Sequence, residues 1–114
     1  MGAFEVTERD LGDGVLLLDV RGEFDVGTSV SVRAALARAD AAGRARVVVD
    51  LTDVPMIDST ALAVLVVAHK RMRRTGRELI VVMPAGGLTA KFQIAGLDRF
   101  LTISDSVAQA LAER

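Results

Sequence analysis

The sequence contains no cysteine, tryptophan or tyrosine, and it has only one histidine, two prolines and four phenylalanines. The lack of cysteine excludes disulfide bonds, thiolate nucleophiles and zinc–thiolate sites together. The longest continuous apolar run, residues 61–68, is far too short to cross a bilayer as a helix. The amino terminus lacks the basic segment and long apolar core of a signal peptide, so we expect a cytoplasmic protein.

Charge is balanced along the chain, because 14 basic and 15 acidic residues give a formal net charge of −1. The basic run Lys70-Arg71-Met72-Arg73-Arg74 suits the solvated last turn of a helix, where cations are favourable. A nucleic-acid surface would need a second basic stripe or stacking aromatic side chains, and the sequence has neither. We therefore expect neither nucleic acid nor a membrane as a partner.

The pattern of apolar residues predicts one α/β domain over residues 1–114, since no linker, repeat or low-complexity tract divides the chain. The predicted strands are residues 4–8, 15–20, 46–51, 78–83 and 100–103. The predicted helices are residues 28–41 with Thr28 or Ser29 as cap, 59–74, 87–95, and a C-terminal helix capped by Ser104. Buried strands joined by helices need crossover connections, which predicts a mixed β-sheet covered by about four helices in the order ββαβαβαβα.

The positions of Ser59 and His69 argue against an enzyme. If both lie on one helix, they are separated by about 15 Å, too far for a Ser–His hydrogen bond. No Gly-x-Ser-x-Gly motif surrounds the serine. We expect His69 to be a side chain partly packed on its helix, and the sequence offers no catalytic residue.

Four aspartates follow or precede predicted strand ends, where α/β proteins usually bind ligands: Asp25, Asp50, Asp53 and Asp58. Such carboxylates could hold magnesium, but no phosphate-binding loop or glycine fingerprint accompanies them. We expect Asp50 and Asp53 to bond backbone N–H groups in turns. The sequence therefore predicts no metal and no cofactor.

The polar turn Asp58-Ser59-Thr60 joins a buried strand to an unusually apolar helix. Backbone N–H groups at a helix start lack intrahelical partners, and the helix dipole favours negative charge there, including a phosphate on a hydroxyl. One interpretation is an ordinary N-cap, because Asp, Ser and Thr are preferred caps. The other is a phosphorylation site, since a helix that is apolar nearly all round must be embedded and would present its start rigidly.

Residues 50–61, Asp-Leu-Thr-Asp-Val-Pro-Met-Ile-Asp-Ser-Thr-Ala, resemble the signature of the STAS domain, in particular that of bacterial anti-sigma factor antagonists. Residues 21–28, Arg-Gly-Glu-Phe-Asp-Val-Gly-Thr, are similar to the family's Gly-Glu-Leu-Asp segment after the second strand. Residues 95–101, Ala-Gly-Leu-Asp-Arg-Phe-Leu, resemble its Gly-Leu element near the C-terminus. The resemblance covers nearly the whole chain in the expected order and implies the STAS fold.

In that family, the serine after the aspartate is phosphorylated by a partner that is both anti-sigma factor and serine kinase. The resemblance implies Ser59 as the phosphorylated residue, with Thr60 as second choice. It also implies that the unphosphorylated chain binds the anti-sigma factor and releases the sigma factor, as in stress responses controlled by partner switching. Phosphorylation would block binding, and a phosphatase would restore it. The implied partner-binding residues are Glu23, Asp25, Asp58, Ser59, Thr60 and Ala61.

Ala61 departs from the family, which usually has glycine at this position. Alanine is costly where a positive φ is needed, whereas a first-turn helical position accepts it well. At an interface it would add one methyl group. This departure leaves an alternative open, a STAS adaptor subunit of another signalling or lipid-transport complex without a phospho-switch. The sequence also leaves the oligomeric state open between a monomer and a weak dimer.

Overall fold

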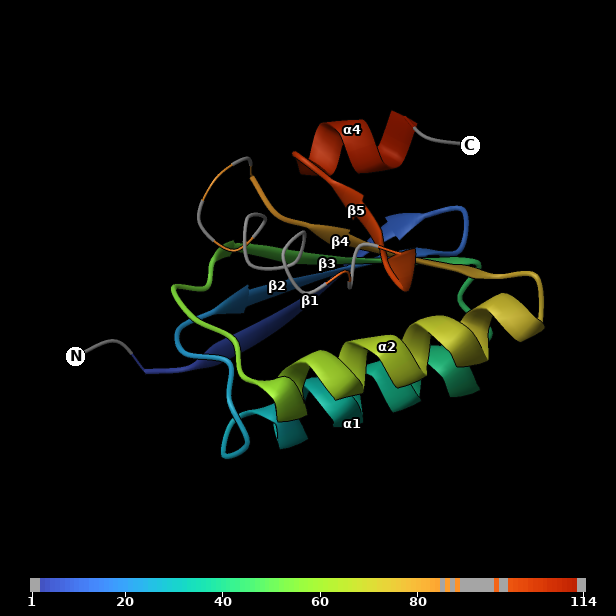
Figure 1. Cartoon of the computed structure of the whole chain (residues 1–114). Coiled ribbons are helices and arrows are strands. Elements are labelled where there is room, and N and C mark those ends of the chain that lie inside the picture. The colour runs from blue at the N-terminus through green and yellow to red at the C-terminus, as the bar shows by residue number, and fades with distance from the viewer. Residues whose placement is uncertain (1–2, 85, 87, 89–95, 97–98, 113–114) are drawn as a thin grey trace.

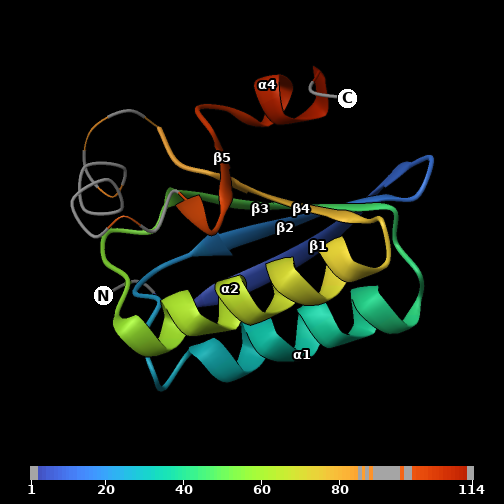
Figure 2. The ribbon, with the colours of Figure 1, turned by 45° about the vertical axis from the view of Figure 1, so that its right-hand side comes forward.

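The structure, a computed structural model, describes residues 3–84, 86, 88, 96 and 99–112. The described elements are β1 (Glu5–Gly12), β2 (Val15–Arg21), α1 (Ser29–Ala41), β3 (Arg46–Asp53), α2 (Ser59–Arg74), β4 (Glu78–Val82), β5 (Thr102–Ser104) and α4 (Val107–Ala112). Helices α1 and α2 lie side by side on one face of the sheet, and α4 lies on the other (Figures 1 and 2). The expected helix over residues 87–95 falls outside the described residues, apart from Leu88.

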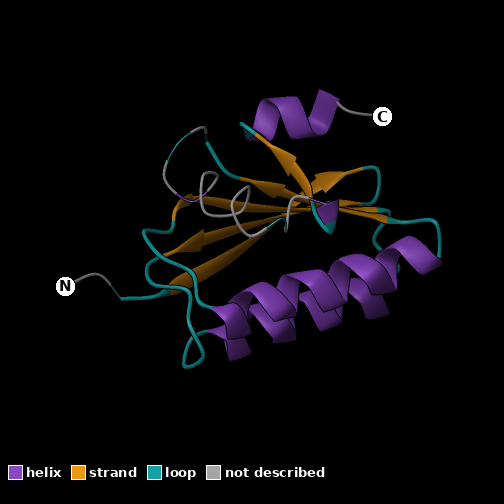
Figure 3. Cartoon of the chain, viewed as in Figure 1, coloured by secondary structure: helices purple, strands orange, loops and turns teal. Residues whose placement is uncertain are grey.

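The five described strands form one sheet in the order β1-β2-β3-β4-β5. Figure 3 shows these strands in orange between helices on the two faces of the sheet. Strands β1 and β2 are antiparallel and joined by a tight turn, whereas β2, β3, β4 and β5 are parallel. The expectation of a mixed sheet in an α/β fold is therefore confirmed. The described part of the chain contains three helices, and the fourth expected helix is the one that falls outside it.

The central strands are buried on both faces, which explains their nearly continuous apolar sequences. Leu16, Leu18 and Val20 of β2 belong to the main core under α1 and α2, whereas Leu17 belongs to a smaller core under α4. The same alternation continues in the neighbouring strand, where Val48 joins the α4 side. Two helical layers thus cover the sheet, and the parallel strands end together at one edge.

Helix α1 begins at Ser29 with Thr28 at the N-cap position, but the expected cap by the Thr28 side chain is absent. The Thr28 hydroxyl instead donates to the carbonyl of Glu23 at 2.8 Å and accepts from the amide of Asp25 at 2.9 Å. The Ser29 amide donates to the Asp25 carbonyl at 2.8 Å. The preceding loop therefore supplies a partner for the first helical amide, and the Thr28 hydroxyl is used within that loop rather than as a cap.

Candidate functional site

Two segments that follow parallel strands run side by side at the carboxyl edge of the sheet. One is the Asp25 loop, residues 22–28 after β2, and the other is the turn before α2, residues 54–58. The amide of Phe24 donates to the Met56 carbonyl at 3.1 Å, and the amide of Asp58 donates to the Phe24 carbonyl at 3.2 Å. The Phe24 side chain is fully buried in the main core, so the Asp25 loop is anchored from inside.

Gly22 allows the chain to leave β2 and enter the Asp25 loop. Its φ is +98°, which favours glycine over residues with a side chain. A Cβ atom at this position would lie only 3.2 Å from the backbone of Phe4. Because glycine has no Cβ atom, the start of the Asp25 loop can pass close to the backbone of Phe4.

Asp58 connects the two segments through both oxygens of its carboxylate. Its backbone is extended at the N-cap position, and Oδ1 accepts a hydrogen bond from the amide of Ala61 at 2.9 Å. Oδ2 accepts from the amide of Val26 at 2.9 Å, across 32 positions of sequence. The expected N-cap is confirmed, and the same carboxylate also ties the Asp25 loop to the start of α2.

Asp25 organises its own loop. Its carboxylate Oδ1 accepts from the amides of Gly27 at 3.0 Å and Thr28 at 3.1 Å, as in an Asx turn. The side chain of Asp25 is half-buried, whereas Glu23 two residues earlier is exposed. The structure therefore brings the predicted Asp25 loop beside the start of α2, with Glu23 on the open side of the loop.

Ser59 is the first residue of α2 and is exposed, directly after the Asp58 cap. Thr60 is half-buried and lines a groove of about 340 Å³ between α1 and α2. Amides in the first helical turn lack intrahelical partners, and the helix dipole adds partial positive charge around Ser59. Of the two hydroxyls, that of Ser59 is the more open to solvent and to a partner.

Ala61 differs from its expected place at a partner interface, because it is 0% exposed and belongs to the main core. Its amide donates to Asp58, and its methyl group packs inward rather than toward solvent. Among the described residues, Asp13 is the only one other than glycine with a positive φ, so Ala61 has the helical backbone that alanine favours. The departure from glycine is therefore accommodated inside the fold.

The other aspartates at this edge have local structural partners. Asp50 Oδ1 accepts from the amide of Thr52 at 2.9 Å and from its hydroxyl at 2.5 Å, which confirms the expected turn carboxylate. Asp53 instead faces the Arg21 side chain at 3.9 Å. Hydrogen bonding and charge from Asp19, followed by the charge of Asp53, raise the pKa of Arg21 above its usual range. Within residues 3–84, 86, 88, 96 and 99–112, no cluster of three or more acidic, histidine or cysteine side chains could hold a metal ion.

Sequence reasoning missed three exposed valines, which lie in the Asp25 loop, at the start of α1 and on α2. Val26, Val30 and Val67 are 65%, 61% and 58% exposed. Val67 also lines the groove between α1 and α2, together with Thr60. A signal was present for Val30, because it lies off the face that Val32, Leu36 and Ala39 turn to the core.

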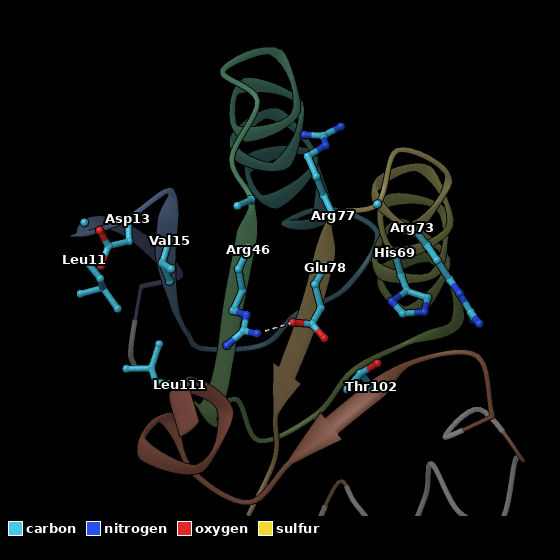
Figure 4. A pocket seen from close by; sticks show the side chains of 13 residues that line it. Leu11, Asp13, Val15, Arg46, His69, Arg73, Arg77, Glu78, Thr102 and Leu111 are labelled. Carbon is cyan, nitrogen blue, oxygen red and sulfur yellow. Dashed lines mark ion pairs between the residues drawn. The ribbon is translucent and has the colours of Figure 1, made fainter. Parts of the chain in front are cut away.

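His69 lies on α2 far from Ser59 and is 8% exposed, more deeply buried than expected. Its Nδ1 atom has no hydrogen-bond partner within the part of the chain that the structure describes. The side chain lines a separate cavity at the other end of the sheet (Figure 4). Within the part of the chain that the structure describes, no helix combines the length and apolar character needed to span a bilayer.

Removal of the Asp58 carboxylate tests whether this one group holds the two segments together. Asp58→Ala should lower the free energy of unfolding by about 1–3 kcal/mol, because an N-cap and a second charge-assisted hydrogen bond are lost. Asp53→Ala is the matched control and should change it by less than about 1 kcal/mol, since the Arg21 pair is exposed. Urea unfolding measures both values, and equal losses would contradict the bridging role.

Comparisons with known proteins agree with this geometry. The family model described as STAS domain matches residues 7–110. Anti-sigma-B factor antagonists of Listeria monocytogenes and Listeria innocua are each 32% identical over 103 residues, covering 90% of this chain and 89% of each relative. The fold is similar to that of an anti-sigma factor antagonist from Mycobacterium paratuberculosis, with a TM-score of 0.86, 23% identity and coverage of 96% of this chain and 92% of that one. It is also similar to phosphorylated SpoIIAA of Bacillus, with a TM-score of 0.71, 16% identity and coverage of 96% and 97%. The chain belongs to the STAS domain family.

Proposed function

We propose that this protein is an anti-sigma factor antagonist that binds an anti-sigma factor through the surface around Ser59. The observation that carries the proposal is the exposed Ser59 at the start of α2, held beside the Asp25 loop by the Asp58 carboxylate. Relatives that are 32% identical over most of the chain bear the name anti-sigma-B factor antagonist. In this proposal residues 1–114 act as one STAS domain that binds a partner and catalyses no reaction.

The surface next to Ser59 has the features of a protein contact. Val26 and Val30 expose apolar side chains, and the amide of Val26 is bonded to the residue directly before Ser59. The groove between α1 and α2 continues this surface from Thr60 toward Val67. Apolar side chains at the centre of an interface supply binding energy when they leave water, and polar groups around them set the register. We propose that the anti-sigma factor covers this surface while the Ser59 hydroxyl is unmodified.

Phosphorylation of Ser59 would change the charge of the surface and leave the fold in place. A phosphoserine carries roughly −1.5 to −2 charges at pH 7, and the start of α2 favours an anion. Asp58 lies directly before this position, and Glu23 and Asp25 lie on the neighbouring loop. A partner fitted to a small hydroxyl would then meet added bulk and like-charge repulsion. We propose that the anti-sigma factor is itself the serine kinase, that a phosphatase reverses the step, and that Thr60 is a weaker acceptor.

The alternative of a STAS adaptor without a phospho-switch rested on Ala61. The buried position of Ala61 removes that support, because the methyl group leaves the exposed surface unchanged. A phosphorylation assay distinguishes the two functions, since an adaptor without a switch would bind its partner independently of ATP.

Ser59→Ala should abolish phosphate incorporation by the cognate anti-sigma kinase and make binding insensitive to ATP. Thr60→Ala is the matched control, because it removes the neighbouring hydroxyl and should leave most phosphorylation in place. Phosphate incorporation is measured by intact mass with purified kinase and ATP. Undiminished phosphorylation of the Ser59→Ala protein would overturn the assignment of the site.

Val30→Asp should weaken binding to the anti-sigma factor by more than about tenfold, because it places a charge in the apolar part of the proposed contact. Ala108→Asp is the control, since it adds the same charge at an exposed position of α4, on the other face of the sheet. Isothermal titration gives both affinities. The proposed surface would be wrong if the two variants bound equally well.

A further inference from the structure

A cavity of about 890 Å³ lies at the amino ends of β3 and β4, at the opposite end of α2 from Ser59 (Figure 4). Its volume falls within the roughly 300–1,000 Å³ of typical small-molecule sites. The proposed binding to an anti-sigma factor does not use this cavity, so its lining needs a separate explanation.

Most of the charged groups around the cavity are already paired within the protein. Arg46 Nη2 lies 2.7 Å from Glu78 Oε1, and Arg46 Nη1 donates to the Ala110 carbonyl at 3.2 Å. Arg77 is paired with the carboxylate of Asp40. These ion pairs neutralise the charges of Arg46, Glu78 and Arg77 within the protein. Other groups around the cavity must therefore recognise a ligand.

Two groups on consecutive turns of α2 remain available, His69 and Arg73. His69 is more than nine-tenths buried and lines the cavity, and its Nδ1 atom, which solvent does not reach, has no hydrogen-bond partner among the described residues. Buried polar atoms are nearly always paired, so an unpartnered imidazole nitrogen beside a cavity calls for a functional explanation. Arg73 lines the same cavity, and its guanidinium has no ion-pair partner among the residues that the structure describes. The two side chains extend from α2 on the side of the cavity that contains Thr102 (Figure 4).

The other side of the cavity is apolar. Leu11, Val15 and Leu111 gather there, across the Arg46–Glu78 pair from His69 and Arg73 (Figure 4). Asp13 also lines the cavity on this side, but it is exposed in the β1–β2 turn, where its φ is +54°. The cavity thus has a cationic end and an apolar end.

We propose that this cavity binds a small organic anion with an apolar body. The anionic group contacts Arg73 and the imidazole of His69, and the apolar part lies against Leu11, Val15 and Leu111. Neither a free inorganic anion nor an uncharged apolar molecule would use both ends of the cavity. The site is separate from the surface around Ser59, so a ligand here would leave that surface open.

Titration of the ¹⁵N-labelled chain with octanoate, followed by amide NMR shifts, tests the proposal. Octanoate should give saturable shifts at residues around the cavity, whereas octanol, with the same chain and no charge, should bind at least about tenfold more weakly. Arg73→Glu should weaken octanoate binding by at least about tenfold, because attraction becomes repulsion. Arg74→Glu is the matched control, since Arg74 is also exposed in the last turn of α2 but does not line this cavity, and it should bind like the unmodified chain.

Several results would overturn the proposal. These are the absence of shifts up to the solubility limit of octanoate, shifts confined to the α1–α2 groove, equal affinity for octanol, and unchanged affinity of Arg73→Glu. Because Arg73 is exposed, the variant should keep its fold, and its amide spectrum without ligand verifies this. None of these outcomes depends on the partner proposed for Ser59, so the two proposals fail independently.

Discussion

The carboxylate of Asp58 is the interaction on which the arrangement of the functional surface depends. One oxygen caps α2 and the other holds the Asp25 loop, so this side chain adds two contacts to the backbone bonds that already join the two segments. Both bonds are made to backbone amides, and bonds to an ionised acceptor are stronger than those between neutral groups. The loop is also held from beneath, because Phe24 is buried in the core. The backbone on which Ser59 lies is therefore held by contacts from the cap and from the neighbouring loop.

Helix α2 connects two regions of different chemistry. Its start carries Ser59 at the carboxyl edge of the sheet, and its last turns carry His69 and Arg73 at the amino edge. The helix dipole suits both ends, since it favours a phosphate at the first turn and cationic side chains at the last. Between the two ends, Leu65 and Val64 pack into the main core. The buried stripe holds the helix in place, so charge added at Ser59 acts on a partner and does not need to move the helix.

Much of the fold follows from local sequence patterns, and much of the site does not. The apolar runs of β2, β3 and β4 predicted buried strands, and the Asp58 cap could be predicted from a polar residue before an apolar helix. The bond from the Val26 amide to Asp58 spans 32 positions and depends on parallel strands ending together, which no local pattern encodes. Thr28 or Ser29 was predicted as the cap of α1, and Thr28 does occupy the N-cap position, but its hydroxyl bonds within the Asp25 loop and does not cap the helix. The inward direction of Ala61 and the cavity beside His69 likewise arise only when the elements pack.

The central claim is that a phosphate at Ser59 acts through local charge and leaves the fold unchanged. The most direct measurement uses homogeneously phosphorylated protein and determines two quantities, its affinity for the anti-sigma factor and its amide NMR spectrum. We predict that affinity falls by at least about a hundredfold, that is by about 2.7 kcal/mol, while shifts stay confined to the Asp25 loop and the first turn of α2. Unchanged affinity, or shifts spread through the sheet and the main core, would contradict the claim.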